Sequence, residues 1–144
     1  CSDREVERYV EKISGPLLDR VDLHVSVPSV EYEAMRRKET PESSADIKRR
    51  VDAARARQAE RFAGTGVLCN AGTRPDQMAK FCALDAAGEK LMEGAFRRMG
   101  LTARSHDRIL RVARTIADLE GSDNIEAPHL AEAIQFRNTD ILKG

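Results

Sequence analysis

The sequence predicts a mainly α-helical protein, in which a small helical bundle over residues 73–138 is preceded by a helix, a tight turn and a strand. Apolar residues recur at helical spacing in most segments, and capping residues or glycines stand at the segment ends. Only residues 21–27 alternate between apolar and polar side chains as a strand does. Aromatic residues make up 4% of the chain and tryptophan is absent, so the core must consist of aliphatic side chains, methionine and alanine.

The elements before the bundle begin with a helix over 3–13, which Ser2 can cap. A Ser-Gly-Pro step at 14–16 ends this helix, and the predicted strand follows and stops at Pro28. The apolar positions of the strand are Val21, Leu23, Val25 and Val27. Because a single strand cannot satisfy its own backbone hydrogen-bonding groups, we expect it to pair with a short neighbour or with something outside this chain.

A short polar helix is expected near 29–38, followed by a break at 40–42. Residues 43–46 (SSAD) have the pattern of a capping box, which predicts a long helix that runs to about Phe62. One narrow stripe of this helix is apolar, at Ile47, Val51, Ala54 and Phe62. The other faces carry six basic side chains against three acidic ones, so we expect the helix to be only partly packed.

The charges of the whole chain balance, with 24 Lys and Arg against 24 Asp and Glu. This balance argues against a general nucleic-acid coat, whose affinity needs a basic excess, but it allows a local basic stripe. The long helix offers such a stripe, and the candidate contacts to DNA or to a neighbouring subunit are Lys48, Arg49, Arg50 and Arg57. The alternative is a solvated face without a partner.

The bundle follows a Gly-Thr-Gly step at 64–66. Its four helices are predicted over 73–82, 85–99, 102–119 and 128–137. Thr102 is the predicted cap of the third helix, and Pro128 lies in the first turn of the last one. Gly100 and Gly121 are the predicted stops, because glycine readily takes the left-handed conformation that ends many helices.

Several kinds of site are missing from the sequence. No apolar run approaches the roughly 20 residues of a membrane span, and no signal peptide is recognisable, so we expect a cytoplasmic protein that does not bind a membrane. The three cysteines form no C-x-x-C pair and the three histidines lie far apart, so neither a disulfide framework nor a metal site is expected. No G-x-x-x-x-G-K-[ST] phosphate loop is present. Because the chain starts with Cys1 rather than methionine, we expect it to be a piece of a longer protein.

Arginine supplies the remaining candidate chemistry. Arg104, Arg108 and Arg111 line one side of the predicted helix at 102–119. Arg104 lies in the first turn, where a positive charge opposes the helix dipole unless an anion is bound. Together with the exposed amides of that turn it predicts a phosphate-binding corner. The alternative is a solvated face with two i, i+4 ion pairs, Asp107–Arg111 and Arg114–Asp118.

Arg20 is the second arginine of interest, because it stands at the junction between the tight turn and the predicted strand. A rigid and permanently charged guanidinium is what phosphoryl transfer requires of an arginine finger. A surface ion pair between Asp19 and Arg20 is the alternative interpretation.

Residues 13–25 (ISGPLLDRVDLHV) resemble the I-S-G-P-L-L-D-R-I-D segment of the magnesium-chelatase-like AAA+ ATPases of the bacterial ComM (YifB) family. The resemblance continues in order through residues 42–44, 53–58, 81–84, 100–104, 107–119 and 129–134. It implies three parts: the tail of an AAA+ core at 1–28, a connecting segment with a long basic helix at 29–63, and a C-terminal helical lid at 64–144.

The resemblance also implies roles for single residues. The arginine of L-L-D-R is the family's arginine finger, which reaches the γ-phosphate bound by a neighbouring subunit, and this position is Arg20. The arginine of L-[ST]-x-R is sensor 2, which contacts nucleotide in its own subunit, and this position is Arg104, with Arg108 as a further candidate. The implied cofactors are ATP and Mg²⁺, held by elements upstream of Cys1.

The implied assembly is a hexameric ring of identical subunits that acts on DNA in recombination or transformation. By itself the chain is expected neither to hydrolyse ATP nor to bind it tightly, because it has no phosphate loop. The alternative function is a non-enzymatic helical module that binds DNA or protein.

Overall fold

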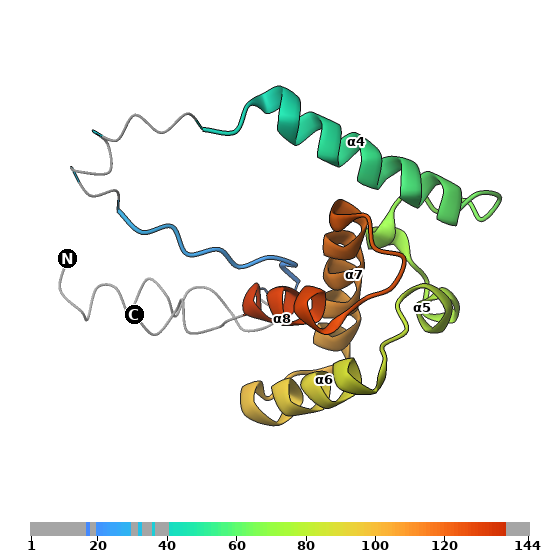
Figure 1. Ribbon diagram of the computed structural model, residues 1–144. Coiled ribbons are helices and arrows are strands. Elements are labelled where there is room, and N and C mark those ends of the chain that lie inside the picture. Colours follow the sequence, from blue (N-terminus) through green and yellow to red (C-terminus); the bar gives the residue numbers. More distant parts are fainter. Residues whose placement is uncertain (1–16, 18–19, 30–31, 33–35, 37–40, 138–144) are drawn as a thin grey trace.

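The computed structural model describes residues 17, 20–29, 32, 36 and 41–137. Its helices are α4 (Ser44–Arg61), α5 (Pro75–Phe81), α6 (Ala86–Met99), α7 (Ala103–Glu120) and α8 (Ala127–Gln135), with a short 3₁₀ turn, η1 (Asn70–Gly72), before α5. Helix α7 lies at the centre and contacts α4, α8 and η1, while α6 packs against α8 (Figure 1). The predicted mainly helical fold is confirmed.

The helix ends follow from local capping. Three side chains accept a backbone N–H three residues further on and so start α4, α6 and α7: Ser43, Asp85 and Thr102. Gly100 and Gly121 end α6 and α7 in the left-handed conformation, with φ of +60° and +77°. These caps and stops confirm the predicted boundaries of the three longest helices.

The two shorter helices are capped in the reverse direction, because a side chain in the first turn accepts the N–H of the cap residue. Gln77 Oε1 accepts from the N–H of Arg74 at 3.1 Å, and α5 therefore begins at Pro75, two residues after the predicted start. At α8 the Nδ1 atom of His129 accepts from the N–H of Glu126 at 2.9 Å. His129 is thus a buried capping residue.

The core lies between α7 and its neighbours and consists of aliphatic and small side chains. Ile109 and Ala113 of α7 and Leu130 of α8 have no exposed surface. Helix α4 contributes through its C-terminal half, where Ala54 is buried. Phe62, which directly follows the helix, is also buried, and its ring meets Phe81 edge-on at 5.4 Å. In the N-terminal half, the apolar residues Ile47 and Val51 remain 45% and 44% exposed. The expectation of a partly packed helix is confirmed.

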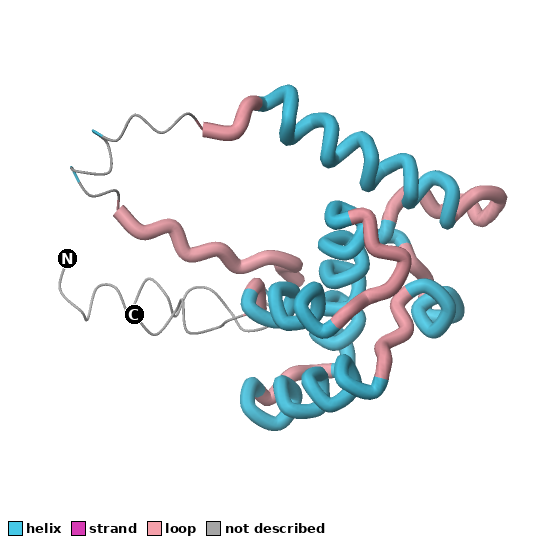
Figure 2. The backbone as a smooth tube through the Cα atoms, in the orientation of Figure 1, coloured by secondary structure: helices cyan, strands magenta, loops and turns pink. Residues whose placement is uncertain are grey.

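The predicted strand at 21–27 is wrong for the structure described. Residues 20–29 form a turn followed by an irregular segment, and the described residues contain no strand (Figure 2). Its four apolar side chains are 42% to 84% exposed, at Val21, Leu23, Val25 and Val27. A strand exists only where a neighbouring strand takes up its N–H and C=O groups, and no such neighbour lies in the described ranges. The alternation in the sequence marks which side chains are apolar, but it does not supply the neighbouring strand whose hydrogen bonds would make this segment a strand.

Two other predicted elements fall wholly or mainly outside the described residues. The helix at 3–13 lies outside them entirely, and of the central positions of the helix near 29–38 only Tyr32 and Arg36 are described, both helical. Within the described part of the chain, no helix has the length and apolar character needed to cross a membrane.

Candidate functional site

Arg104 lies exposed in the first turn of α7, as its sequence position predicts. Its guanidinium has no ion pair or hydrogen bond to the described part of the chain. The first turn of α7 contains no acidic residue, and the N–H of Ser105 is taken up by Thr102 Oγ1 at 3.2 Å. Amide dipoles and a permanent positive charge therefore meet at this helix end, which favours a bound anion.

Arg20 is also exposed, in a turn closed by a hydrogen bond from its N–H to the carbonyl of Leu17 at 2.9 Å. Its guanidinium has no partner among the described residues. The backbone of the turn is held instead, because Arg108 Nη1 donates to the carbonyl of Arg20 at 2.6 Å and pairs with the carboxylate of Asp22. Among the described residues, the side chain of Arg20 is thus left free while its backbone is held against α7.

Arg108 is placed differently from the sequence expectation. It follows Arg104 by one helical turn, but its guanidinium is taken up by the Arg20 carbonyl and Asp22. Its side chain is 20% exposed. Its role as a further nucleotide contact stays a prediction, and the contacts that the structure shows are to the Arg20 turn.

A mostly apolar pocket of about 360 Å³ lies beside this contact. Its lining includes Leu23, Val112 and Ile116 of α7, and Phe136, which directly follows α8. The segment after Arg20 therefore rests on the surface of the bundle rather than inside its core.

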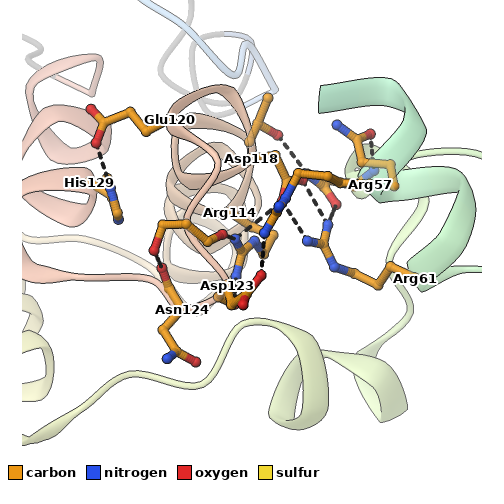
Figure 3. Close-up of polar contacts among 12 residues, drawn as sticks. Arg57, Arg61, Arg114, Asp118, Glu120, Asp123, Asn124 and His129 are labelled. Carbon is orange, nitrogen blue, oxygen red and sulfur yellow. Dashed lines mark hydrogen bonds and ion pairs between the residues drawn. The ribbon is translucent and has the colours of Figure 1, made fainter. Parts of the chain in front are cut away.

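The basic residues predicted as DNA or subunit contacts are all paired with carboxylates. Along α4 these pairs are Lys48–Asp52, Arg49–Asp46 and Arg50–Glu42, and across to the α7–α8 turn Arg57–Asp123 (Figure 3 shows the last). The three pairs along α4 are solvent-exposed, and such pairs contribute only about 0–1 kcal/mol each. A phosphate can therefore replace the acidic partner at little cost, but the local positive charge is smaller than the sequence alone implies.

A buried ionic network, which the sequence pattern did not reveal, joins α4 to α7. The carboxylate of Asp118 has no exposed surface and accepts from Arg61 at 2.5 and 2.7 Å (Figure 3). It also accepts from Asn70 Nδ2 at 2.8 Å. Arg114 approaches the same carboxylate at 3.1 Å and donates to the carbonyls of Ser122 and Asp123. This network fixes the C-terminal half of α4 on the bundle.

The pKa of Asp118 reflects this environment. Burial acts to raise the pKa of its carboxyl, but hydrogen bonds from Arg61 and Asn70 and the charge of Arg114 outweigh burial and lower the pKa below its ordinary value. Burial likewise raises the pKa of the Cys82 thiol to about 11, so this cysteine is an inert core residue.

The predicted solvated face of α7 needs two corrections. The pair Arg114–Asp118 forms, but its side chains are only 3% and 0% exposed, so it is buried rather than solvated. The pair Asp107–Arg111 does not form: Asp107 contacts His106 at 3.2 Å, and Arg111 donates to the carbonyl of Thr73 at 2.9 Å. The i, i+4 spacing was the only sequence signal, and it does not tell whether other elements cover a helix face.

The described residues contain no group of three or more histidine, cysteine or acidic side chains that could hold a metal ion. Of the described histidines, His129 accepts the N–H of Glu126 and pairs with Glu120 at 2.9 Å, and His106 packs against the ring of Phe96 (Figure 3 shows the His129–Glu120 pair). The roles of these two histidines are packing and capping.

Comparison with known proteins gives two family matches. Residues 41–137 match the family described as magnesium chelatase, subunit ChlI C-terminal, and residues 1–35 match magnesium chelatase, subunit ChlI. The second match contains Arg20 and the first contains Arg104 and Arg108.

Curated relatives match over nearly the whole chain. The protein YifB of Escherichia coli is 38% identical over 143 residues, which is 99% of this chain and 28% of YifB. The competence protein ComM of Haemophilus influenzae is 37% identical over 137 residues, which is 94% of this chain and 26% of ComM. The chain thus spans little more than a quarter of the length of these relatives.

Proposed function

The chain belongs to the magnesium chelatase subunit ChlI C-terminal family, and from this we propose that it is the arginine-finger element and helical lid of a ring-forming AAA+ ATPase. In this proposal Arg20 acts on nucleotide bound by a neighbouring subunit, and Arg104 contacts nucleotide in its own subunit. ATP and Mg²⁺ would be bound by a phosphate loop and by the magnesium-binding acidic residues of the nucleotide-binding part. The phosphate loop is absent from this chain.

The observation that supports this proposal is that the guanidinium groups of Arg20 and Arg104 are both exposed and have no partner among the described residues. The neighbouring arginines in the same region instead donate hydrogen bonds to carbonyl groups or carboxylates. These arginines are Arg108, Arg111 and Arg114. An unpaired arginine on a held backbone is suited to meet charge that develops on a transferred phosphoryl group, because little reorganisation is needed when that charge appears. Bound Mg²⁺ would neutralise part of the phosphate charge.

DNA is the macromolecule that we propose the assembled motor acts on. The support is the row of exposed basic side chains on α4, whose acidic partners are exchangeable, together with the competence-protein name of one relative. A hexameric ring of identical subunits is part of the same proposal, because a finger that acts in trans requires a neighbour.

A second candidate function is a helical interaction module without ATPase activity. The observation that favours it is the N-terminal half of α4, where Ile47 and Val51 are exposed beside the basic residues. A surface of this kind can bind a partner whether or not the molecule is a motor.

Mixed assemblies of the complete protein test the ATPase proposal. Arg20→Ala is expected to leave nucleotide affinity nearly unchanged and to lower turnover by about 10³ or more, the usual scale for an arginine finger. Arg104→Ala is expected to weaken nucleotide binding as well as turnover. Mixing Arg20→Ala subunits with subunits that bind no nucleotide but keep Arg20 should restore turnover, because each then supplies what the other lacks.

The control is Arg97→Ala, which removes an exposed arginine that pairs with Glu93 on α6. This variant should match the unmodified protein in both measurements. Normal turnover by Arg20→Ala, or mixtures that never recover activity, would contradict the finger assignment and favour the interaction module.

A further inference from the structure

We propose that Arg108 is a positioning residue for the arginine finger, and that α7 thereby couples the two nucleotide-facing arginines of one subunit. Arg104 would sense nucleotide in its own subunit, and Arg108, one helical turn later, holds the turn that presents Arg20 to the neighbour. This inference rests on the proposed function of Arg20.

The first support is the double contact of Arg108. Its Nη1 atom donates to the backbone carbonyl of Arg20 at 2.6 Å and also pairs with the carboxylate of Asp22. The guanidinium is planar and always charged, so both acceptors are fixed relative to one rigid group. Because the Arg108 side chain is 20% exposed, this ion pair is less screened by solvent than the pairs along α4.

The second support is an independent anchor on the next residue. Arg137, which is 3% exposed, donates through Nη1 to the carbonyl of Val21 at 2.6 Å and through Nη2 to Ser105 Oγ at 3.0 Å. The N–H of His24 donates to the carbonyl of Phe136 at 2.8 Å. The segment from Arg20 to His24 is therefore held at several successive points, by the first turns of α7 and by the two residues that follow α8.

The third support is the arrangement on α7 itself. Arg104 and Arg108 are four residues apart and so lie on one side of a continuous helix, and Ser105 in the same turn contacts the other anchor. In this proposal, a shift of the start of α7 when Arg104 contacts phosphate is carried to the Arg20 turn through these contacts. The occupancy of one subunit's nucleotide site would in this way change the aim of its finger at the next site.

The same contacts argue against Arg108 as a direct nucleotide ligand. A backbone carbonyl and a carboxylate already take up its Nη1 atom, so turning the guanidinium away toward a phosphate would break the contacts that hold the Arg20 turn. The two roles predict different effects on nucleotide affinity, and experiment can separate them.

The test measures turnover, nucleotide affinity and amide hydrogen exchange in the complete protein. Arg108→Ala is expected to lower kcat by about 10²-fold, the scale of a misplacement of about 1 Å, with KM for ATP unchanged. Amide exchange at residues 20–24 should accelerate, because the turn is then held by one anchor fewer. Asp22→Ala removes the ion pair from the other end without altering α7, and a smaller change of the same kind is expected.

Combining Arg108→Ala with Arg20→Ala distinguishes a positioning role of Arg108 from a general structural role. The comparison is made in the Arg20→Ala background. There Arg108→Ala should cause no further loss of turnover, because the residue acts only through Arg20. The matched control is again Arg97→Ala, whose ion pair lies on α6 away from the finger turn.

Three outcomes would overturn the inference: unchanged kcat in Arg108→Ala, a loss of nucleotide affinity like that of Arg104→Ala, or a further loss of turnover in the Arg20→Ala background. Failure of the proposed function looks different, because Arg20→Ala itself would then turn over normally. If Arg20→Ala is impaired and Arg108→Ala is not, only the positioning role is wrong.

Discussion

Asp118 shows at the scale of one residue how strongly the bundle depends on a buried charge. Its carboxylate has no exposed surface and meets two arginines and Asn70. Removing one partner of a buried ion pair leaves the other charge uncompensated, which costs about 3–5 kcal/mol. Asp118→Ala should therefore lower the free energy of unfolding by about that amount in chemical denaturation.

The matched control is Asp123→Ala, which removes the carboxylate that pairs with Arg57. That carboxylate is 90% exposed, so its loss should cost less than about 1 kcal/mol. If the two substitutions lowered the free energy of unfolding equally, burial of the Asp118 network would contribute nothing to stability.

The pH dependence of stability follows from the same carboxyl. The pKa of Asp118 is lowered in the folded protein, so its contribution to the free energy of unfolding is complete above the unfolded pKa of about 4. That contribution disappears as the pH falls through the lower, folded pKa. Unfolding measured between pH 7 and pH 2 should show this acid destabilisation in the unmodified chain, and it should be smaller in Asp118→Asn. An equally steep decline in the variant would contradict the assignment.

Helix α4 is the element on which the DNA proposal can be tested. Replacing Lys48 and Arg50 by glutamine removes basic groups whose pairs lie on exposed parts of α4. The salt slope of DNA binding is the slope of a plot of the logarithm of affinity against the logarithm of salt concentration. The magnitude of this slope should fall by about one for every phosphate that the variant no longer neutralises. Arg57 is unsuitable for this test, because it also joins α4 to Asp123.

The corresponding control replaces Arg97 by glutamine on α6, which changes net charge without touching α4. If DNA affinity and salt slope in the α4 variant stay at the level of the control, the basic residues of α4 are only a solvated face. That result would leave the ATPase proposal intact, since the finger and the lid do not depend on α4 contacting DNA.

At the scale of the whole molecule, the chain is expected to fold without nucleotide and to remain inactive alone. Helices α5 to α8 share one apolar core, but the sequence contains no phosphate loop. Purified chain should therefore give a helical circular dichroism spectrum with cooperative melting and no magnesium-dependent ATP hydrolysis. Sustained hydrolysis by this chain would contradict the proposed division of roles between this chain and a separate nucleotide-binding part.

Local chemistry made the helical part of the fold predictable from the sequence. Ser43, Asp85 and Thr102 start helices and Gly100 and Gly121 end them, because caps and left-handed stops involve residues only three or four positions apart. The positions of Arg20 and Arg104 at a turn and a helix start were recognisable for the same reason, together with the resemblance to a known family.

Only the tertiary structure decided which charges are buried, paired or free. Arg114–Asp118 looked like a surface pair and is buried, because α4 and η1 bring Arg61 and Asn70 from far along the chain. The apolar alternation at 21–27 did not become a strand, because a ladder needs a partner that the described residues do not supply. The contact of Arg108 with the Arg20 turn joins residues 88 positions apart, and no local pattern encodes such a separation.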